Sequence, residues 1–94
     1  MERGYICPIV EVENPLTGGL AYTVDLPPLQ TGDSAQRRIP TQEGVPLYTH
    51  ALVVIKTDDF SAMDGFEGAE PLDEVPASLD DAAIAALMAG RERG

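Results

Sequence analysis

Apolar side chains are most densely concentrated between Leu47 and Lys56, where the chain reads Leu-Tyr-Thr-His-Ala-Leu-Val-Val-Ile-Lys. The unbroken run from Ala51 to Ile55 ends in three β-branched residues, which suit an extended backbone better than a helix. Successive side chains of a strand point to opposite faces, so both faces of this strand are apolar at its centre. The pattern predicts a central strand at 47–56 that the rest of the chain covers on both sides.

Two stretches near the N-terminus, 4–13 and 20–26, contain alternating apolar positions. They are separated by Asn-Pro-Leu-Thr-Gly-Gly, which is rich in turn-forming residues, and the arrangement predicts an antiparallel hairpin. Pro8 cannot donate a ladder hydrogen bond, so we expect the first strand to lie at a sheet edge or to carry a bulge there. A further short strand is expected at 36–40.

The C-terminal part of the chain predicts an amphipathic helix at about 79–90. Ser78 and Asp81 have the spacing of a helix-capping box, and Gly90 can end the helix. The apolar side can pack on the chain's own sheet or dock into a partner. Its members are Leu79, Ala83, Ile84, Leu87 and Met88.

The segment between the central strand and this helix is acidic and broken by glycine and proline. A short helix is possible in it, capped by Thr57 or Asp58 and ended by Gly65. The predicted fold class is α+β, with a small, mostly antiparallel sheet of three or four strands and one C-terminal helix. We expect a single domain at 1–94, divided into a sheet (1–56), an acidic connection (57–77) and the helix (78–90).

The charge balance narrows the range of partners. The 94 residues include 16 acidic and six basic side chains, a net charge of −10, and nine of the acids lie between Asp58 and Asp81. Nucleic-acid backbones and anionic membranes attract clustered lysine and arginine, so we expect neither as a direct partner. No signal-peptide pattern or membrane-spanning apolar run is visible. The acidic segment itself fits a solvated connection, a contact surface for a basic partner or a nucleic-acid mimic.

Few residues are candidates for chemistry. Cys7 and His50 are the only thiol and the only imidazole, and strand pairing could bring them together, but Cys7 lies in an apolar run typical of a small buried side chain. The spacing of Asp58, Asp59 and Asp64 does not match a calcium-binding loop. No phosphate-binding loop, nucleophile elbow or zinc spacing is present. We therefore predict a protein that is not an enzyme, with no catalytic, cofactor or metal site.

Arg37 and Arg38 form the only basic cluster. Neighbouring residues of a strand point to opposite faces. One of the two could pair with an acid of the 58–81 segment, in its own chain or in a neighbouring copy, but a solvated pair is the favoured interpretation.

Several short motifs lie between residues 5 and 60. They are Tyr-Ile-Cys-Pro-Ile-Val from Tyr5, Ile-Pro-Thr from Ile39, Gly-Val-Pro from Gly44, Ala-Leu-Val-Val-Ile from Ala51, and Asp-Asp-Phe from Asp58. This layout resembles that of the small structural-module proteins of tailed bacteriophages. The resemblance implies a role in the virion or in its assembly, in many copies and without chemistry of its own.

The sequence thus favours a non-enzymatic structural or accessory protein of a bacteriophage particle, either a capsid decoration or a tail-associated subunit. Its expected partners are a larger viral structural protein and copies of itself, and its expected location is the virion, assembled in the host cytoplasm. The helix stripe, Arg37 and Arg38 are the candidate docking residues. The alternative is an acidic inhibitor or nucleic-acid mimic that blocks a basic host protein.

Overall fold

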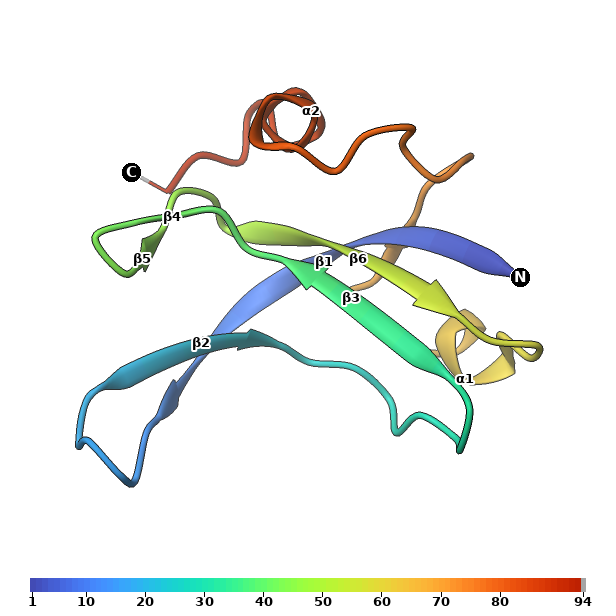
Figure 1. Ribbon diagram of the computed structural model, residues 1–94, viewed down its shortest axis with the longest axis horizontal. Coiled ribbons are helices and arrows are strands. Elements are labelled where there is room, and N and C mark those ends of the chain that lie inside the picture. Colours follow the sequence, from blue (N-terminus) through green and yellow to red (C-terminus); the bar gives the residue numbers. More distant parts are fainter. Residues whose placement is uncertain (94) are drawn as a thin grey trace.

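The computed structural model describes residues 1–93 and is built on a curled antiparallel sheet (Figure 1). The strand order is β2-β1-β6-β3, and the short β7 pairs with β1, while β4 and β5 form a separate two-stranded sheet. The helix α2 lies over one side of the main sheet, and the β1–β2 hairpin projects from it at the lower left of Figure 1. The elements are β1 (Glu2–Glu13), β2 (Leu20–Val24), β3 (Ser34–Arg38), β4 (Thr41–Gln42), β5 (Val45–Pro46), β6 (His50–Lys56), α1 (Ser61–Asp64), β7 (Glu70–Pro71) and α2 (Asp81–Leu87).

The predicted central strand is confirmed as β6, which lies between β1 and β3. All five side chains from Ala51 to Ile55 are buried. The strand begins at His50 rather than Leu47, because Tyr48 instead forms an isolated bridge with Glu92 in the C-terminal segment.

The two faces of β6 belong to two separate apolar clusters. The concave face of the curled sheet carries the larger cluster, and α2 covers the smaller one on the opposite face. The larger cluster contains Tyr5, Cys7, Val24, Ala51, Val53, Ile55, Phe60 and Met63. The smaller contains Ile6, Leu52, Ile84 and Met88.

The N-terminal hairpin is confirmed, but the prediction that its first strand lies at an edge or bulges at Pro8 is wrong. The first part of β1 pairs with β6, and its other edge pairs with β7 and then with β2. The Ile9 amide donates to the Thr49 carbonyl on the β6 side. Main-chain groups alternate in direction along a strand, so the nitrogen of Pro8 faces the opposite edge, between Ile6, the last residue paired with β7, and Ile9, the first paired with β2. The missing N–H therefore removes no ladder bond.

The C-terminal helix is present but shorter than the predicted 79–90. The side chain of Asp80, not that of Ser78, caps α2 by accepting a hydrogen bond from the Ala83 amide at 2.8 Å. The Ser78 hydroxyl instead accepts a hydrogen bond from the Asp80 amide, before the helix begins. The helix therefore starts at Asp81, two residues later than predicted. Gly90 has a φ of 85° and lies beyond the helix end.

The short helix considered for the acidic connection is present as α1, followed by Gly65. Neither Thr57 nor Asp58 caps it. Asp59 instead accepts hydrogen bonds from the amide and the hydroxyl of Ser61. The fold is thus a small, mostly antiparallel sheet with two short helices in residues 1–93.

Candidate interaction surface

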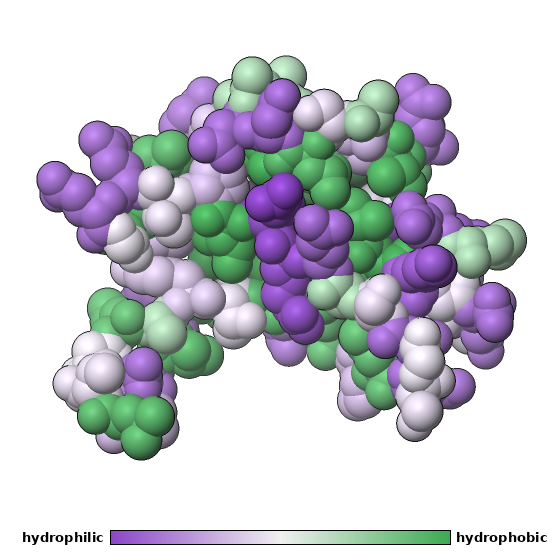
Figure 2. Space-filling model, in the orientation of Figure 1, coloured by the Kyte–Doolittle hydropathy of each residue, from purple (hydrophilic) through white to green (hydrophobic). Residues whose placement is uncertain are grey.

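The β1–β2 hairpin exposes apolar side chains beyond the body of the sheet. Val12 is 42% exposed, Leu20 is 64% exposed and Leu16, at the tip, is 93% exposed. Figure 2 shows pale and green side chains over this projection and strongly hydrophilic ones over the centre of the molecule. Exposed apolar side chains that gather on one element are typical of interaction sites.

One face of this hairpin carries no charge. Cross-strand partners share a face, and the register pairs Val10 with Thr23 and Val12 with Ala21. We call these four residues the outer hairpin face. They lie on the same side of β1 as Ile6, which α2 covers, but the helix does not bury Val10 or Val12.

The opposite face of the hairpin is tied to the C-terminal segment. Arg93 donates a hydrogen bond to the Glu11 carboxylate at 2.8 Å, and its guanidinium lies 5.5 Å from the centroid of the Tyr22 ring. Glu11 and Tyr22 are themselves cross-strand partners. The arginine therefore neutralises one of the two acids of β1 that face this side, and the hairpin has one face that carries charges and one that carries none.

The predicted helix stripe packs mainly on the chain's own sheet. Ile84 and Met88 are almost fully buried against Ile6 and Leu52. Of the two arrangements considered for the stripe, packing on the chain's own sheet and docking into a partner, these two residues adopt the first. Leu79 and Leu87 lie at the margin of this cluster, and Ala83 is half-buried. A partner-binding role for the stripe stays a prediction, and in this structure Ile84 and Met88 do not present a free surface.

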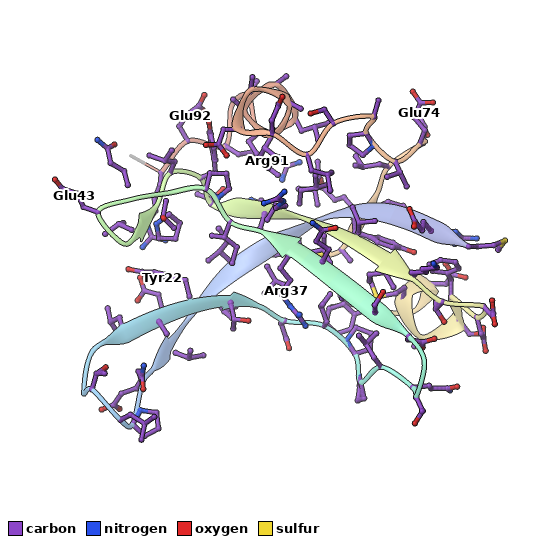
Figure 3. All side chains as sticks on the ribbon, in the orientation of Figure 1. Tyr22, Arg37, Glu43, Glu74, Arg91 and Glu92 are labelled. Carbon is purple, nitrogen blue, oxygen red and sulfur yellow. The ribbon has the colours of Figure 1, made fainter. Side chains whose placement is uncertain are left out.

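Arg37 and Arg38 lie on opposite faces of β3. Arg37 is opposite Val53 and so faces the concave side, and Figure 3 shows its side chain directed from β3 toward β2. Arg38 is opposite Leu52 on the outer side. Both are exposed, and neither forms an ion pair with an acid of residues 1–93.

The structure does not bring Cys7 and His50 together. Cys7 is paired with Ala51 and points into the concave core, whereas His50 lies on the Leu52 face and contacts the Thr49 hydroxyl at 2.8 Å. Burial, followed by the negative charge of Glu70, raises the pKa of the Cys7 thiol to about 11. Burial and the positive charge of Arg91 lower the pKa of His50, and the negative charge of Glu70 partly offsets this shift by raising it.

All nine acids of the 58–81 segment are exposed. Asp64 pairs with Arg3 at 3.4 Å and Glu70 pairs with Arg91, so these two anchor the segment to β1 and to the C-terminal segment. Hydrogen bonds from the side chain and the amide of Ser61 lower the pKa of Asp59. Across residues 1–93, no group of three or more histidine, cysteine or acidic side chains is arranged to hold a metal ion.

A hollow of about 210 Å³ lies between the segment after β2, the end of β6 and α1. Pockets for small ligands usually span about 300–1,000 Å³, so this hollow is small for such a role. Its lining includes Pro27, Asp33, Ile55, Thr57 and Met63. In the described part of the chain, no helix is long and apolar enough to cross a membrane.

Comparisons with protein-family models, with curated proteins and with solved structures find no match to this chain. The resemblance to phage structural proteins therefore stays a prediction. The hairpin surface was missed by the sequence reasoning, although one signal was available: Leu16 is an apolar residue inside a turn.

Proposed function

We propose that this protein is a non-enzymatic structural or accessory subunit of a bacteriophage particle that docks on a larger viral structural protein. The observation that carries the proposal is the projecting hairpin, with its uncharged outer face and the exposed Leu16 at its tip. The resemblance of residues 5–60 to phage structural modules supports a phage particle as the assembly in which the protein docks. Its location would be the virion, after assembly in the host cytoplasm.

Docking would use the outer hairpin face as an insertion element. Val10, Val12 and Leu16 would enter an apolar groove of the larger protein, where removal of their surface from water favours binding. The exposed acids of the 58–81 segment would remain in solvent or face a basic patch. Because these acids repel other acidic surfaces, they would restrict which proteins the subunit binds and in which orientation it binds them.

Lysine substitutions on the hairpin test this proposal directly. Val12→Lys and Leu16→Lys should each weaken co-sedimentation with particles by about tenfold or more, because a charge would have to be desolvated in an apolar groove. Val45→Lys is the matched control, since Val45 is also exposed but lies on β5, away from the hairpin. Normal particle binding by both hairpin variants would contradict the docking surface.

Electron microscopy of particles tests the location. Particles assembled without the protein should lack a discrete density and lose physical stability. An unchanged density map together with normal particle stability would remove the structural role, whichever surface is involved.

A second candidate is an acidic inhibitor that blocks a basic host protein. It is favoured by the exposure of all nine acids between Asp58 and Asp81, of which only Asp64 and Glu70 form ion pairs within residues 1–93. This function predicts binding that weakens steeply with salt and is competed by DNA. Capture of a nucleic-acid-binding host enzyme from lysate would support it, whereas capture of a coat or tail protein would support the structural role.

A further inference from the structure

The strands at the two ends of the sheet order, β2 and β3, differ in how well they are protected against pairing, and the third outer strand, β7, is only two residues long. Edge strands commonly carry charged side chains or proline, which discourage the addition of another strand. At one edge, β3 carries Arg37 and Arg38 and is followed closely by Pro40. At the other, β2 itself reads Leu-Ala-Tyr-Thr-Val, with no charge and no proline, although Asp25 follows it directly and Pro27 and Pro28 come soon after. Figure 2 shows the same contrast, with hydrophilic side chains over the middle of the molecule and pale or green ones over the hairpin.

The main-chain groups of β2 that could accept a new strand follow from the register. Ile9 donates its N–H away from β2, so the Ile9–Val24 pair exchanges no hydrogen bonds between the two strands. Bonded and non-bonded pairs alternate in an antiparallel ladder. Leu20, Tyr22 and Val24 therefore turn their N–H and C=O groups away from β1, and no strand of residues 1–93 pairs with them.

We propose that this free edge of β2 pairs antiparallel with the same edge of a second copy, which joins two hairpins into one four-stranded sheet. A two-fold axis at Tyr22 would place the two Tyr22 residues opposite each other and Leu20 opposite Val24 of the other copy. These are the residues whose main-chain groups point outward, so each pair is of the hydrogen-bonded kind. Tyr22 forms the central pair, whereas Val24 is only 5% exposed in the separate copy and has to be uncovered before the two outer pairs form. The strand is self-complementary in this register, because every side chain that meets its counterpart is uncharged.

Charge favours a second copy at this edge over pairing at the other edge. Each chain has a net charge of −10, so copies repel each other at most approaches. In the proposed pairing, the two β1 strands are separated by three strand spacings, about 14 Å. Their acids Glu11 and Glu13 are therefore farther apart than the screening length of about 8 Å at physiological ionic strength. Pairing through β3 would instead bring Arg37 and Arg38 of both copies together.

The strength of the association follows from its size. Stable complexes bury about 800 Å² on each partner, and a five-residue edge is well below that. An isolated two-stranded hairpin is also only marginally stable, so extension to four strands stabilises the hairpin as it forms. We therefore expect a concentration-dependent dimer rather than a permanent one. This self-association does not depend on the proposed docking, because it uses the main-chain edge of β2 and not the outer hairpin face.

Sedimentation velocity of the purified chain over a wide concentration range tests the proposal. The unmodified chain should show a concentration-dependent shift from monomer to dimer, and Tyr22→Lys should weaken dimerisation by about tenfold or more, since like charges would meet at the axis. The hairpin should survive this change, because the added ammonium group would face the Glu11 carboxylate, even though the contact of Arg93 with the Tyr22 ring is lost. Gln36→Lys is the matched control, with the same added charge on the opposite edge.

Leu20→Pro provides a second variant that removes one outward N–H and leaves the β1–β2 ladder intact. Circular dichroism would verify that each variant is folded. Weakened dimers for both β2 variants and normal dimers for Gln36→Lys would support the β2 edge. A chain that is monomeric at every concentration, or dimers insensitive to both β2 variants, would overturn the proposal. Loss of particle docking with retained dimerisation would affect only the proposed function.

Discussion

The ring of Pro8 packs against Gly68, so that a Cβ on this glycine would lie 3.5 Å from Pro8 Cγ. Gly68 has a φ of 91°, a left-handed conformation that side chains disfavour. The contact lies where β1 changes its partner from β7 to β2. The proline and the glycine together thus fill the stretch of that edge between the two pairings, where no ladder bond forms.

The first prediction concerns this glycine. Gly68→Ala should lower the free energy of unfolding by roughly 1–2 kcal/mol, because alanine resists a positive φ. Gly65→Ala is the control, since its φ is −95° and a methyl group added there would meet no neighbouring atom within 4 Å. Urea denaturation of both variants measures the difference. Equal stability of the two variants would contradict the positive φ of Gly68.

The second prediction tests the central strand. Leu52 belongs to β6, and its side chain is fully buried under α2. Leu52→Ala should therefore lower the free energy of unfolding by about 2–5 kcal/mol. Val45→Ala, at an exposed position of β5, should change it by less than about 0.5 kcal/mol. Thermal or urea denaturation followed by circular dichroism gives both values. A tolerant Leu52 would mean that α2 does not pack on the sheet.

The third prediction concerns an unpaired hydroxyl. Tyr5 is 2% exposed, and within residues 1–93 its buried hydroxyl has no hydrogen-bond partner. Burial of an unpaired polar group is costly, so Tyr5→Phe should raise the free energy of unfolding by about 1 kcal/mol. Tyr48→Phe, at a half-buried position, provides the comparison in the same denaturation series. A destabilised Tyr5→Phe variant would show that this hydroxyl does have a partner.

The fourth prediction follows from the raised pKa of Cys7. At pH 8 the folded chain should react far more slowly with a chromogenic disulfide reagent than the urea-unfolded chain, since the thiol is buried and protonated. Stability should be insensitive to this group below its ordinary pKa near 9 and should fall as the pH rises from there toward about 11. Cys7→Ala should lack this part of the alkaline loss. Rapid labelling of the folded chain would contradict the buried thiol.

The fifth prediction separates the two possible caps of α2. Asp80→Ala should lower the midpoint of thermal unfolding more than Ser78→Ala, because only Asp80 accepts from the Ala83 amide. This hydrogen bond, with that of Ser78, lowers the pKa of Asp80. The contribution of Asp80 is therefore present above the ordinary carboxyl pKa near 3.8 and is lost as the pH falls through the lower folded value. If Ser78→Ala lowered the midpoint more than Asp80→Ala, Ser78 would be the cap, as the sequence predicts.

The sequence predicted those elements whose local pattern and burial agree. The run from Ala51 to Ile55 is apolar on both faces, and such a strand is stable only inside a sheet. The turn residues after Glu13 likewise determine the hairpin. Ser78 and Asp80 are both good caps, however, and only the packing of Ile84 and Met88 on Leu52 decides which one begins the helix.

Long-range contacts could not be predicted in the same way. The pairing of Arg93 with Glu11 joins residues 82 positions apart, and neither side chain has a local pattern that identifies the other. The interior position of Pro8 also depends on where β7 ends and β2 begins. The exposed hairpin surface was missed for a related reason, since the alternation of Val10 and Val12 does not reveal how far α2 extends.

The unequal protection of β2 and β3 would also limit how large an assembly of copies can grow. A sheet with two open edges can add copies without end and form a fibre. Among residues 1–93, once the strand at 20–24 is occupied, the outer strands left in each copy are β3, whose Arg37 and Arg38 repel the same residues of another copy, and β7, which is two residues long and includes Pro71. Growth by this route would therefore stop at a closed pair.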